Sequence, residues 1–488
     1  MRKVTGSLSC IVGALLAASL ANAGPPELGP AVKRYVKVDA PEVALVHARV
    51  IDGTGAPARS NQTLILGGGD ITALGADGTV TIPEGALVID LTGKSVIPGL
   101  VMMHEHLFYP TGPGDYGYED ESFTRLYLAG GVTSIRTAGN LNGYGDLDIK
   151  RSIDEGRKVG PWIDATAPYL DGASEVQIDQ KYVLKSANDA ERMVNFWADA
   201  GATSFKAYMG ITRAELEAAI RAAHARGLKI TAHLCTVTLR EAAEMGIDNL
   251  EHTIAPATDF VSGKKPDVCP GQAAAWGSVA LEDPNGPRVR ALLADLVKHH
   301  VALTSTMTAL EIVTPGRPTP PGIEVLEPEL RARAEQVLQV MSTKRSGPAQ
   351  PHDSLPSSDL MARLFKNLLA VDREFVQMGG LLMAGTDPSV DGVIPGFADQ
   401  REVELLVEAG FTPEEAIRIC SLNAATYLGR AARVGSIAAG KQADLVVIDG
   451  DPSHQVSDIR HVETVFKQGV GYDPAKLIDS VRGKVGLY

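Results

Sequence analysis

The chain has 488 residues, 44% hydrophobic and 22% charged, a composition that excludes a disordered, fibrous or coiled-coil protein. Its formal net charge is −13, and it has no Lys/Arg-rich tract, so nucleic acid is excluded as an expected partner because phosphate contacts need clustered cations. We expect a small-molecule substrate instead; whether the chain forms a homo-oligomer stays open.

The N-terminus has the organisation of a secretory signal peptide, residues 1–23. Arg2 and Lys3 form its positive region, residues 11–20 its apolar region, and Ala21-Asn-Ala23 a small-residue cleavage site. The apolar run is shorter than the roughly 20 residues that span a bilayer, which argues against an uncleaved anchor. We expect cleavage after Ala23 and an exported mature protein, periplasmic or secreted, that has no membrane contact.

The two flanks of the mature chain, 24–96 and 429–488, are predicted to form one small domain. Short strands separated by Gly and Pro turns are expected at 44–52, 62–66, 86–90, 443–449 and 464–469. Two β-rich flanks around a different middle indicate a discontinuous β-sandwich.

The middle of the chain, 97–428, alternates strands and helices, which is typical of parallel βαβ units. Capping boxes at Thr212-Arg-Ala-Glu215 and Thr412-Pro-Glu-Glu415 mark two helix starts. Eight strands are expected at about 97–103, 132–137, 162–168, 203–208, 229–234, 247–251, 301–306 and 381–386. The predicted fold class is therefore α/β, a (β/α)8 TIM barrel with the small β-sandwich attached.

Two features of this middle part leave alternatives open. A Pro-rich insertion near 308–356 is either a lid over the barrel mouth or a surface excursion. The mature chain has three cysteines, Cys235, Cys269 and Cys420, too few for a disulfide framework, although a Cys235–Cys269 bridge stays open.

Residues that can bind metal ions follow several predicted strands. His104 and His106 end the first strand, and because side chains alternate along a strand they leave on the same face. Lys206 points into the barrel from the fourth strand, where a buried amine needs a partner, either an acid in an ion pair or CO2 in a carbamate. The other candidates are His233 after strand five, His252 after strand six and Asp387 after strand eight. Such barrels keep their sites at these strand ends, so the sequence predicts a metal centre there.

This order of residues resembles the amidohydrolase superfamily of metal-dependent hydrolases. The stretches Pro98-Gly-Leu, Glu414 to Ala425 and Gly435 to Val446 are similar to the family's first barrel strand, its penultimate helix and its return to the sandwich. Within the superfamily, the chain is most similar to the imidazolonepropionase-like group, which includes Xaa-Pro dipeptidases and N-acyl-amino-acid hydrolases.

The resemblance implies two divalent ions, with Zn2+ as the first expectation and Mn2+ or Co2+ as alternatives. A CO2-derived carbamate on Lys206 would bridge the two ions. The remaining ligands would be His104, His106 and Asp387 for one ion, and His233 and His252 for the other. A hydroxide between the ions would attack the substrate carbonyl, with Asp387 as general base and then acid. Tyr208 is expected either to donate to the developing oxyanion or simply to fill the barrel.

The expected reaction is hydrolysis of an amide bond, in a dipeptide or an N-acyl amino acid. The alternatives are a mononuclear deaminase or cyclic-amide hydrolase of the same superfamily, a periplasmic metal- or solute-binding protein, and a scaffold. Against deamination, Thr236 stands where the deaminases have a glutamate. Against peptide specificity, Tyr169-Leu-Asp-Gly-Ala stands where many dipeptidase-like members have Gly-Gly-His. Arg136 is interpreted either as a structural ion-pair residue or as a clamp for a substrate carboxylate.

Overall fold

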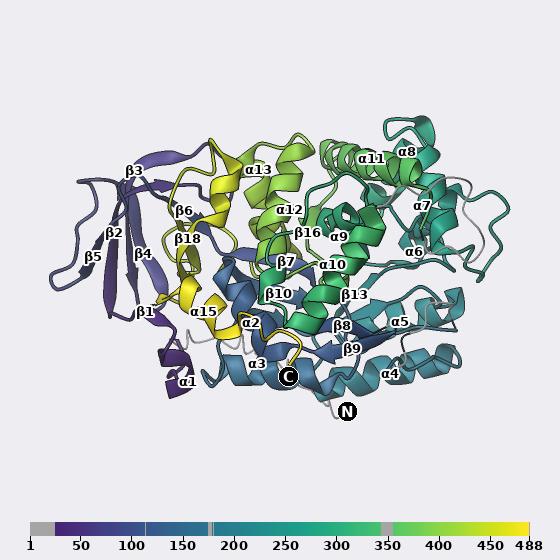
Figure 1. The fold of residues 1–488 in the computed structure, drawn as a ribbon, viewed down its shortest axis with the longest axis horizontal. Coiled ribbons are helices and arrows are strands. Elements are labelled where there is room, and N and C mark those ends of the chain that lie inside the picture. The colour runs from purple at the N-terminus through teal and green to yellow at the C-terminus, as the bar shows by residue number, and fades with distance from the viewer. Residues whose placement is uncertain (1–24, 113, 174–177, 179, 343–354, 488) are drawn as a thin grey trace, which may run out of the picture.

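The computed structural model describes residues 25–112, 114–173, 178, 180–342 and 355–487. The predicted signal peptide and residues 343–354 of the predicted insertion lie outside these ranges. The β-rich flanks gather at one end of an elongated molecule, and the alternating strands and helices occupy the rest (Figure 1).

One nine-stranded sheet joins the two flanks, in the order β1-β19-β18-β17-β6-β2-β3-β4 with β5 on β2. Its strands are β1 (Val36–Val38), β2 (Glu42–Val50), β3 (Arg59–Gly67), β4 (Asp70–Ala76), β5 (Leu87–Asp90), β6 (Ser95–Pro98), β17 (Leu445–Ile448), β18 (Val462–Lys467) and β19 (Val470–Tyr472). The two flanks meet where β6 pairs antiparallel with β17. The strands expected in a sandwich belong to a single sheet because β2 pairs with β5 over its first half and with β6 at its end.

The eight strands of the middle form two parallel sheets, β11-β10-β7 and β12-β13-β14-β15-β16. They are β7 (Leu100–Glu105), β10 (Val132–Thr137), β11 (Trp162–Asp164), β12 (Ser204–Ala207), β13 (Lys229–Ala232), β14 (Asn249–Glu251), β15 (Ala302–Ser305) and β16 (Leu382–Ala384). A parallel bridge between Thr166 and Ser204 links the two sheets on one side. On the other side, the amides of Thr386 and Asp387 donate to the carbonyl of His104 at 3.1 and 2.9 Å.

The first of the eight expected strands, 97–103, is wrong as a single element. β6 ends at Pro98 and β7 begins at Leu100, so the segment belongs to two sheets. Gly99 lies between them, and a Cβ there would stand 2.2 Å from Oγ1 of Thr133. Only glycine allows this close approach to β10, and the unbroken apolar run on both sides hides the change of sheet from a periodicity argument.

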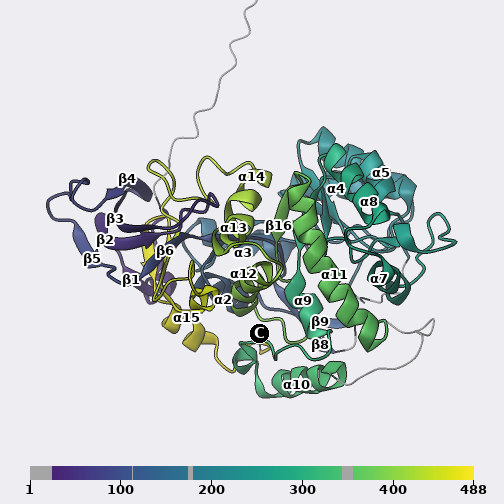
Figure 2. The same ribbon diagram turned by 90° about the horizontal axis from the view of Figure 1, so that it is seen from above.

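Helices surround the parallel strands (Figures 1 and 2). They are α1 (Pro30–Lys33), α2 (Asp120–Ala129), α3 (Tyr144–Asp154), α4 (Ala187–Ala200), α5 (Arg213–Ala225), α6 (Leu239–Met245), α7 (Gln272–Leu281), α8 (Pro287–Lys298), α9 (Met307–Ile312), α10 (Pro328–Ser342), α11 (Ser358–Gln377), α12 (Phe397–Glu408), α13 (Pro413–Arg418), α14 (Ala424–Tyr427) and α15 (Pro474–Val481). Both predicted capping boxes are confirmed, at the starts of α5 and α13. The main hydrophobic core lies between the helices and the parallel strands, and a smaller one lies against the nine-stranded sheet.

The described part of the Pro-rich insertion has irregular structure and turns at 313–322, between the helices α9 and α10. Its helix α10 lies beside the hairpin β8 (Phe108–Gly112) and β9 (Asp115–Tyr118), which follows β7 (Figure 2). Arg333 of α10 pairs with Asp391 at 3.1 Å and donates to the carbonyl of Gly112 at 3.4 Å. Because Asp391 follows the predicted ligand Asp387 by four residues, α10 contacts the rim of the strand ends.

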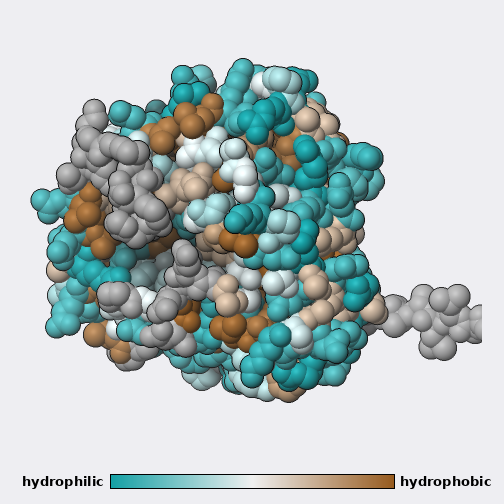
Figure 3. All heavy atoms as spheres, turned by 90° about the vertical axis from the view of Figure 1, so that its right-hand side faces the viewer, coloured by the Kyte–Doolittle hydropathy of each residue, from teal (hydrophilic) through white to brown (hydrophobic). Residues whose placement is uncertain are grey.

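Within the described ranges, no helix is long and apolar enough to cross a membrane. The face shown in Figure 3 is mostly hydrophilic, and its hydrophobic residues form small, separate patches. The large hydrophobic side chains that are exposed come from distant segments, for example Phe196 in α4 and Leu281 at the end of α7.

Candidate metal centre

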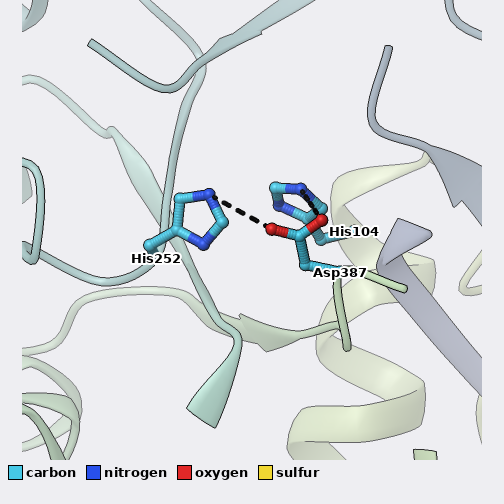
Figure 4. Close-up of side chains that lie close together, drawn as sticks. All are labelled: His104, His252 and Asp387. Carbon is cyan, nitrogen blue, oxygen red and sulfur yellow. Dashed lines mark ion pairs between the residues drawn. The ribbon is translucent and has the colours of Figure 1, made fainter. Parts of the chain in front are cut away.

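The predicted metal ligands lie together at the ends of five parallel strands. Ring centroids are 5.3 Å apart for His104 and His106, 4.6 Å for His104 and His252, and 4.5 Å for His252 and His233. The carboxylate of Asp387 lies 3.2 Å from Nε2 of His106, 3.7 Å from Nε2 of His104 and 3.9 Å from Nε2 of His252. Figure 4 shows this carboxylate between the His104 and His252 rings.

Two of these ligands sit on left-handed backbone. His252 has a φ of 62° and Asp387 a φ of 55°, and Thr253 beside His252 has a φ of 56°. Non-glycine residues rarely adopt this conformation, and it persists where surrounding contacts hold it in place. Here it turns the chain at the ends of β14 and β16, where the side chains meet.

Hydrogen bonds on the far side of three rings set which nitrogen faces the centre. The Nδ1 contacts are His104 to Glu251 Oε2 (2.8 Å), His106 to the Gly139 carbonyl (3.1 Å) and His252 to Thr306 Oγ1 (2.7 Å). An ionised carboxylate and a carbonyl only accept, so Nδ1 of His104 and of His106 carries the hydrogen. The Nε2 lone pairs of these two rings therefore face Asp387, the arrangement that metal-binding histidines use.

Burial sets the protonation of the centre. It lowers the pKa of His104 to about 4, with Lys206 adding to the effect, and the pKa of His252 to about 3, with His104 adding to it. Burial alone would raise the pKa of Asp387, but the neighbouring histidines hold it well below its ordinary value. Neutral imidazoles around an ionised carboxylate form a donor set that fits a divalent cation.

Two buried nitrogens of this cluster, Nζ of Lys206 and Nε2 of His252, have no hydrogen-bond partner in the described part of the chain. The acid nearest to Lys206 is Glu251, at 3.7 Å, which is an ion-pair distance and too long for a hydrogen bond. Burial lowers the pKa of Lys206 to about 8, so part of the amine is neutral near pH 7. An Nε2 atom without a partner in this buried cluster fits a metal ligand, because buried polar atoms are otherwise nearly always paired.

Glu251 was not predicted as a site residue, but it contacts His104 on the side of the ring that faces away from the centre. It accepts from Nη2 of Arg136 at 2.6 Å and from the hydroxyl of Thr231, in addition to its bond with His104. Arg136 is 1% exposed and also donates to the carbonyl of Met103 at 2.8 Å. The interpretation of Arg136 as a structural ion-pair residue is therefore confirmed.

Tyr208 lies next to the histidines. Its ring centroid is 5.3 Å from that of His233 and 4.8 Å from that of Tyr169. The ring centroid of Tyr169, which follows β11, lies in turn 6.3 Å from that of His106. Lys181, which pairs with Asp171, has its Nζ 5.4 Å from the Tyr208 ring.

Two residues after β13 do not belong to the centre. The hydroxyl of Thr236 lies within hydrogen-bond distance of the carbonyls of Met209 and Ile211, so it supports the neighbouring loop. Cys235 forms a disulfide with Cys269, with 4.9 Å between their Cα atoms, and is not available as a metal ligand. The bridge that the sequence left open is thus present, and it ties the end of β13 to the loop before α7.

The most compact metal-competent set among the described residues is His104, His252 and Asp387, whose ligand atoms all lie within 4.8 Å of one another. This set differs from the predicted division of ligands between two ions, because the prediction places His252 with His233 on the second ion and not with His104 and Asp387. The assignment of each ligand to one of two ions therefore stays a prediction.

Comparisons with known proteins indicate what the chain is similar to. The amidohydrolase family model matches residues 361–475, which include Asp387. An imidazolonepropionase from Alkaliphilus oremlandii (strain OhILAs) is 28% identical over 148 residues, 29% of this chain and 32% of the relative. A Xaa-Pro dipeptidase solved with bound methionine has a TM-score of 0.64 and 18% identity, covering 88% of this chain and 100% of the other. Residues 361–475 thus match the amidohydrolase family, and over most of the chain the solved structures share its fold.

Another solved structure shares the fold over nearly the whole length of this chain. The A. niger ochratoxinase structure has a TM-score of 0.61 at 16% identity and covers 92% of this chain and 100% of the other. At such identities the solved structures show a common fold. In sequence, the chain spans about a third of the length of the imidazolonepropionase that it matches.

Proposed function

We propose that this protein is a metal-dependent amidohydrolase that cleaves amide C–N bonds at a binuclear centre. The observation that carries the proposal is the convergence on Asp387 of imidazole Nε2 atoms from His104, His106 and His252, within 3.2 to 3.9 Å. Without a cation, an ionised carboxylate and neutral imidazole lone pairs at these distances repel one another.

We further propose that the eight parallel strands close into a (β/α)8 barrel whose C-terminal end carries the centre. The Thr166–Ser204 bridge supports closure on one side. The hydrogen bonds from Thr386 and Asp387 to the His104 carbonyl support it on the other. In this arrangement every proposed ligand leaves the same end of the barrel, where such folds keep their active sites.

The proposed ligands keep the division implied by the resemblance. One ion would be held by His104, His106 and Asp387, the other by His233 and His252, with a carbamate on Lys206 between them. The neutral amine fraction of Lys206 is the form that reacts with CO2. The reaction would convert Nζ of Lys206, which has no hydrogen-bond partner among the described residues, into part of a carbamate whose oxygens can bind metal. Imidazole and carboxylate ligands suit Zn2+, Mn2+ and Co2+.

In the proposed mechanism, metal ions held by these residues would supply a water of lowered pKa and polarise the substrate carbonyl. Asp387 is ionised in the folded protein, so it can accept the proton of the attacking water and then pass it to the leaving amine. Tyr208, beside His233, would donate to the oxygen on which negative charge develops. Glu251 holds His104 in the tautomer that presents Nε2 to the centre.

The proposed substrates are dipeptides and N-acyl amino acids. The similarity of fold to a Xaa-Pro dipeptidase supports a dipeptide substrate, and the paired aromatic rings of Tyr169 and Tyr208 support an apolar group beside its amide. A second candidate is mononuclear hydrolysis of a cyclic amide, which is favoured by the compact set of His104, His252 and Asp387 and by the imidazolonepropionase relatives. Deamination is disfavoured because the Thr236 hydroxyl is bound by backbone carbonyls.

We propose that the mature protein is exported after cleavage behind Ala23. The Cys235–Cys269 bond supports this proposal, because disulfides persist in oxidising compartments. Expression with residues 1–23 intact in a Gram-negative host should give a periplasmic chain that begins at Gly24. A full-length chain in the cytosol would contradict export.

The test of function is Asp387→Asn, assayed with dipeptides, N-acyl amino acids and cyclic amides. We expect turnover to fall by about 10²–10⁴-fold, the usual effect of removing a general acid–base group, while at least one metal ion is retained. Asp295→Asn on the surface of α8 is the matched control and should change nothing. Unchanged hydrolysis in Asp387→Asn would refute the mechanism, and no hydrolysis by the parent with any substrate would favour a binding protein.

A further inference from the structure

The turn that carries His252 is strained and needs support. His252 and Thr253 are consecutive left-handed residues, with φ values of 62° and 56°. Left-handed backbone is especially unfavourable for Thr, a β-branched residue. The hydroxyl of Thr253 donates to Oδ1 of Asp372 at 2.7 Å, and its amide donates to the carbonyl of Thr304 at 3.0 Å. Asp372, in the C-terminal half of α11, is completely buried.

The second carboxylate oxygen of Asp372 is part of a hydrogen-bond chain that continues through Ser305 to Glu402. The number of hydrogens in this chain is limited. Oγ of Ser305 lies 2.8 Å from Oδ2 of Asp372 and 3.0 Å from Oε1 of Glu402 in α12. A hydroxyl has one hydrogen and can donate to only one of these acids. If both acids were ionised, the other contact would bring two lone pairs together, so one acid carries a hydrogen.

The backbone decides which acid carries this hydrogen. Glu402 accepts from the amide of Met307 on Oε1 at 3.0 Å and from the amide of Thr308 on Oε2 at 2.9 Å. Both of its oxygens are thus acceptors, whereas among the described residues Oδ2 of Asp372 has a hydrogen-bond contact only with the Ser305 hydroxyl. Burial raises the pKa of each acid to about 7, so the amides of Met307 and Thr308, which favour the ionised form of Glu402, make the distinction.

We propose that Asp372 and Glu402 are positioning residues of the metal centre: Asp372 donates to Ser305, Ser305 donates to Glu402, and this chain holds the Thr253 turn that presents His252. The chain also fixes the start of α9, where Thr306 contacts Nδ1 of His252 at 2.7 Å. The positions of the His252 backbone and of its ring therefore both depend on the hydrogen bonds between Asp372, Ser305 and Glu402. The inference rests on the proposed function only in taking His252 as a metal ligand.

The test compares substitutions that keep or break this pattern of hydrogens. Asp372→Asn places an NH2 donor toward Ser305 and an acceptor toward Thr253, as the protonated acid does, so metal content and the Co2+ absorption spectrum should match the parent. Glu402→Gln places an NH2 against a backbone N–H or the Ser305 hydrogen, and should weaken binding of one metal ion by about 10–100-fold, the usual cost of losing an outer-shell partner. Asp372→Val, which removes both contacts, should behave like Glu402→Gln.

Glu374→Gln, an acid of the same helix that pairs with Arg290, is the control and should leave all readouts unchanged. If Asp372→Asn loses metal as Glu402→Gln does, or if Glu402→Gln is harmless, the proposal is wrong. The comparison of Asp372→Asn with Glu402→Gln tests the proposal even when Asp372→Val does not fold. Difference infrared spectroscopy tests the hydrogen without any metal: a protonated carboxyl C=O band should vanish in Asp372→Asn and persist in Glu374→Gln, and its absence from the parent would overturn the proposal even if the metal centre is confirmed.

Discussion

Glu251 accepts a hydrogen bond from Nδ1 of His104 at 2.8 Å and so couples the end of β14 to the end of β7. The same carboxylate takes the guanidinium of Arg136 at 2.6 Å and lies 3.7 Å from Nζ of Lys206. Burial alone would raise the pKa of Glu251, but Lys206, Arg136 and His104 together hold it well below its ordinary value. One buried carboxylate thus orients a proposed ligand and balances the two cations behind the centre.

Glu251→Gln should weaken metal binding by about 10–100-fold, because an amide is a weaker acceptor for His104 and leaves Arg136 without an anionic partner. The measurement is a competition titration of the metal-loaded protein against a chelator of known affinity. Glu217→Gln on the exposed face of α5 is the control. Equal affinities in the parent and in Glu251→Gln would show that this contact does not support the centre.

Tyr208→Phe should lower kcat by about 10–10³-fold with little change in KM or metal content, since it removes a donor used only when charge develops on the substrate oxygen. The ring contact with His233 at 5.3 Å is kept by Phe, which makes the substitution specific for the hydroxyl. A rise in KM with kcat unchanged would instead assign Tyr208 to substrate binding, and no effect would leave it as barrel filling.

The sequence was informative where residue type and strand position act together. Lys206, in a predicted inward position, and Asp387, just beyond a strand, could be placed because alternation and the polarity of parallel strands determine where such side chains meet. Glu251 carried no comparable signal, since a polar residue next to a histidine at a strand end has many ordinary explanations.

Other parts of the structure depend on tertiary contacts that no local pattern encodes. Asp372 lies on the amphipathic helix α11, and its burial against Thr253 follows from the packing of α11 on the strand ends. The division of 97–103 into β6 and β7 depends on the close approach of Gly99 to Thr133. In each case the partner residue is distant in sequence.

Replacing Cys235 and Cys269 with serine should lower the free energy of unfolding by about 3–4 kcal/mol, the chain-entropy expectation for a loop with this 34-residue separation. The measurement is denaturant unfolding of the parent and the double variant. Because Cys235 follows His233 by two residues, metal affinity should fall as well. Cys420→Ser, which leaves the disulfide intact, is the control. Unfolding curves that coincide for the parent and the double variant would show that the disulfide does not constrain the fold.

Asp372 predicts a pH dependence with a definite sign. Its pKa is about 7 in the folded protein, because of burial, against about 4 in an unfolded chain, so between these values the folded state binds more protons. The contribution of Asp372 to stability is therefore complete below about pH 4 and is lost as the pH rises through about 7. Glu402, which faces the same Ser305 hydroxyl, has a pKa shifted in the same direction.

Asp372→Asn lacks this titration, so the melting temperature of the variant relative to the parent should rise between pH 5 and pH 8. The measurement is thermal unfolding of both chelator-treated proteins across this range. A constant difference between the two curves would show that Asp372 does not change its protonation in the folded state.

The most direct test of the binuclear centre is the metal content of the purified mature protein, measured by plasma mass spectrometry beside Lys206→Ala, with Lys158→Ala as a surface-lysine control. The proposed centre predicts about two ions per chain in the parent and in the control, fewer in Lys206→Ala, and recovery when a short carboxylate such as acetate replaces the missing carbamate. One ion per chain in both the parent and Lys206→Ala would contradict the bridging lysine and favour a mononuclear site, and no bound metal in the parent would contradict the metal centre itself.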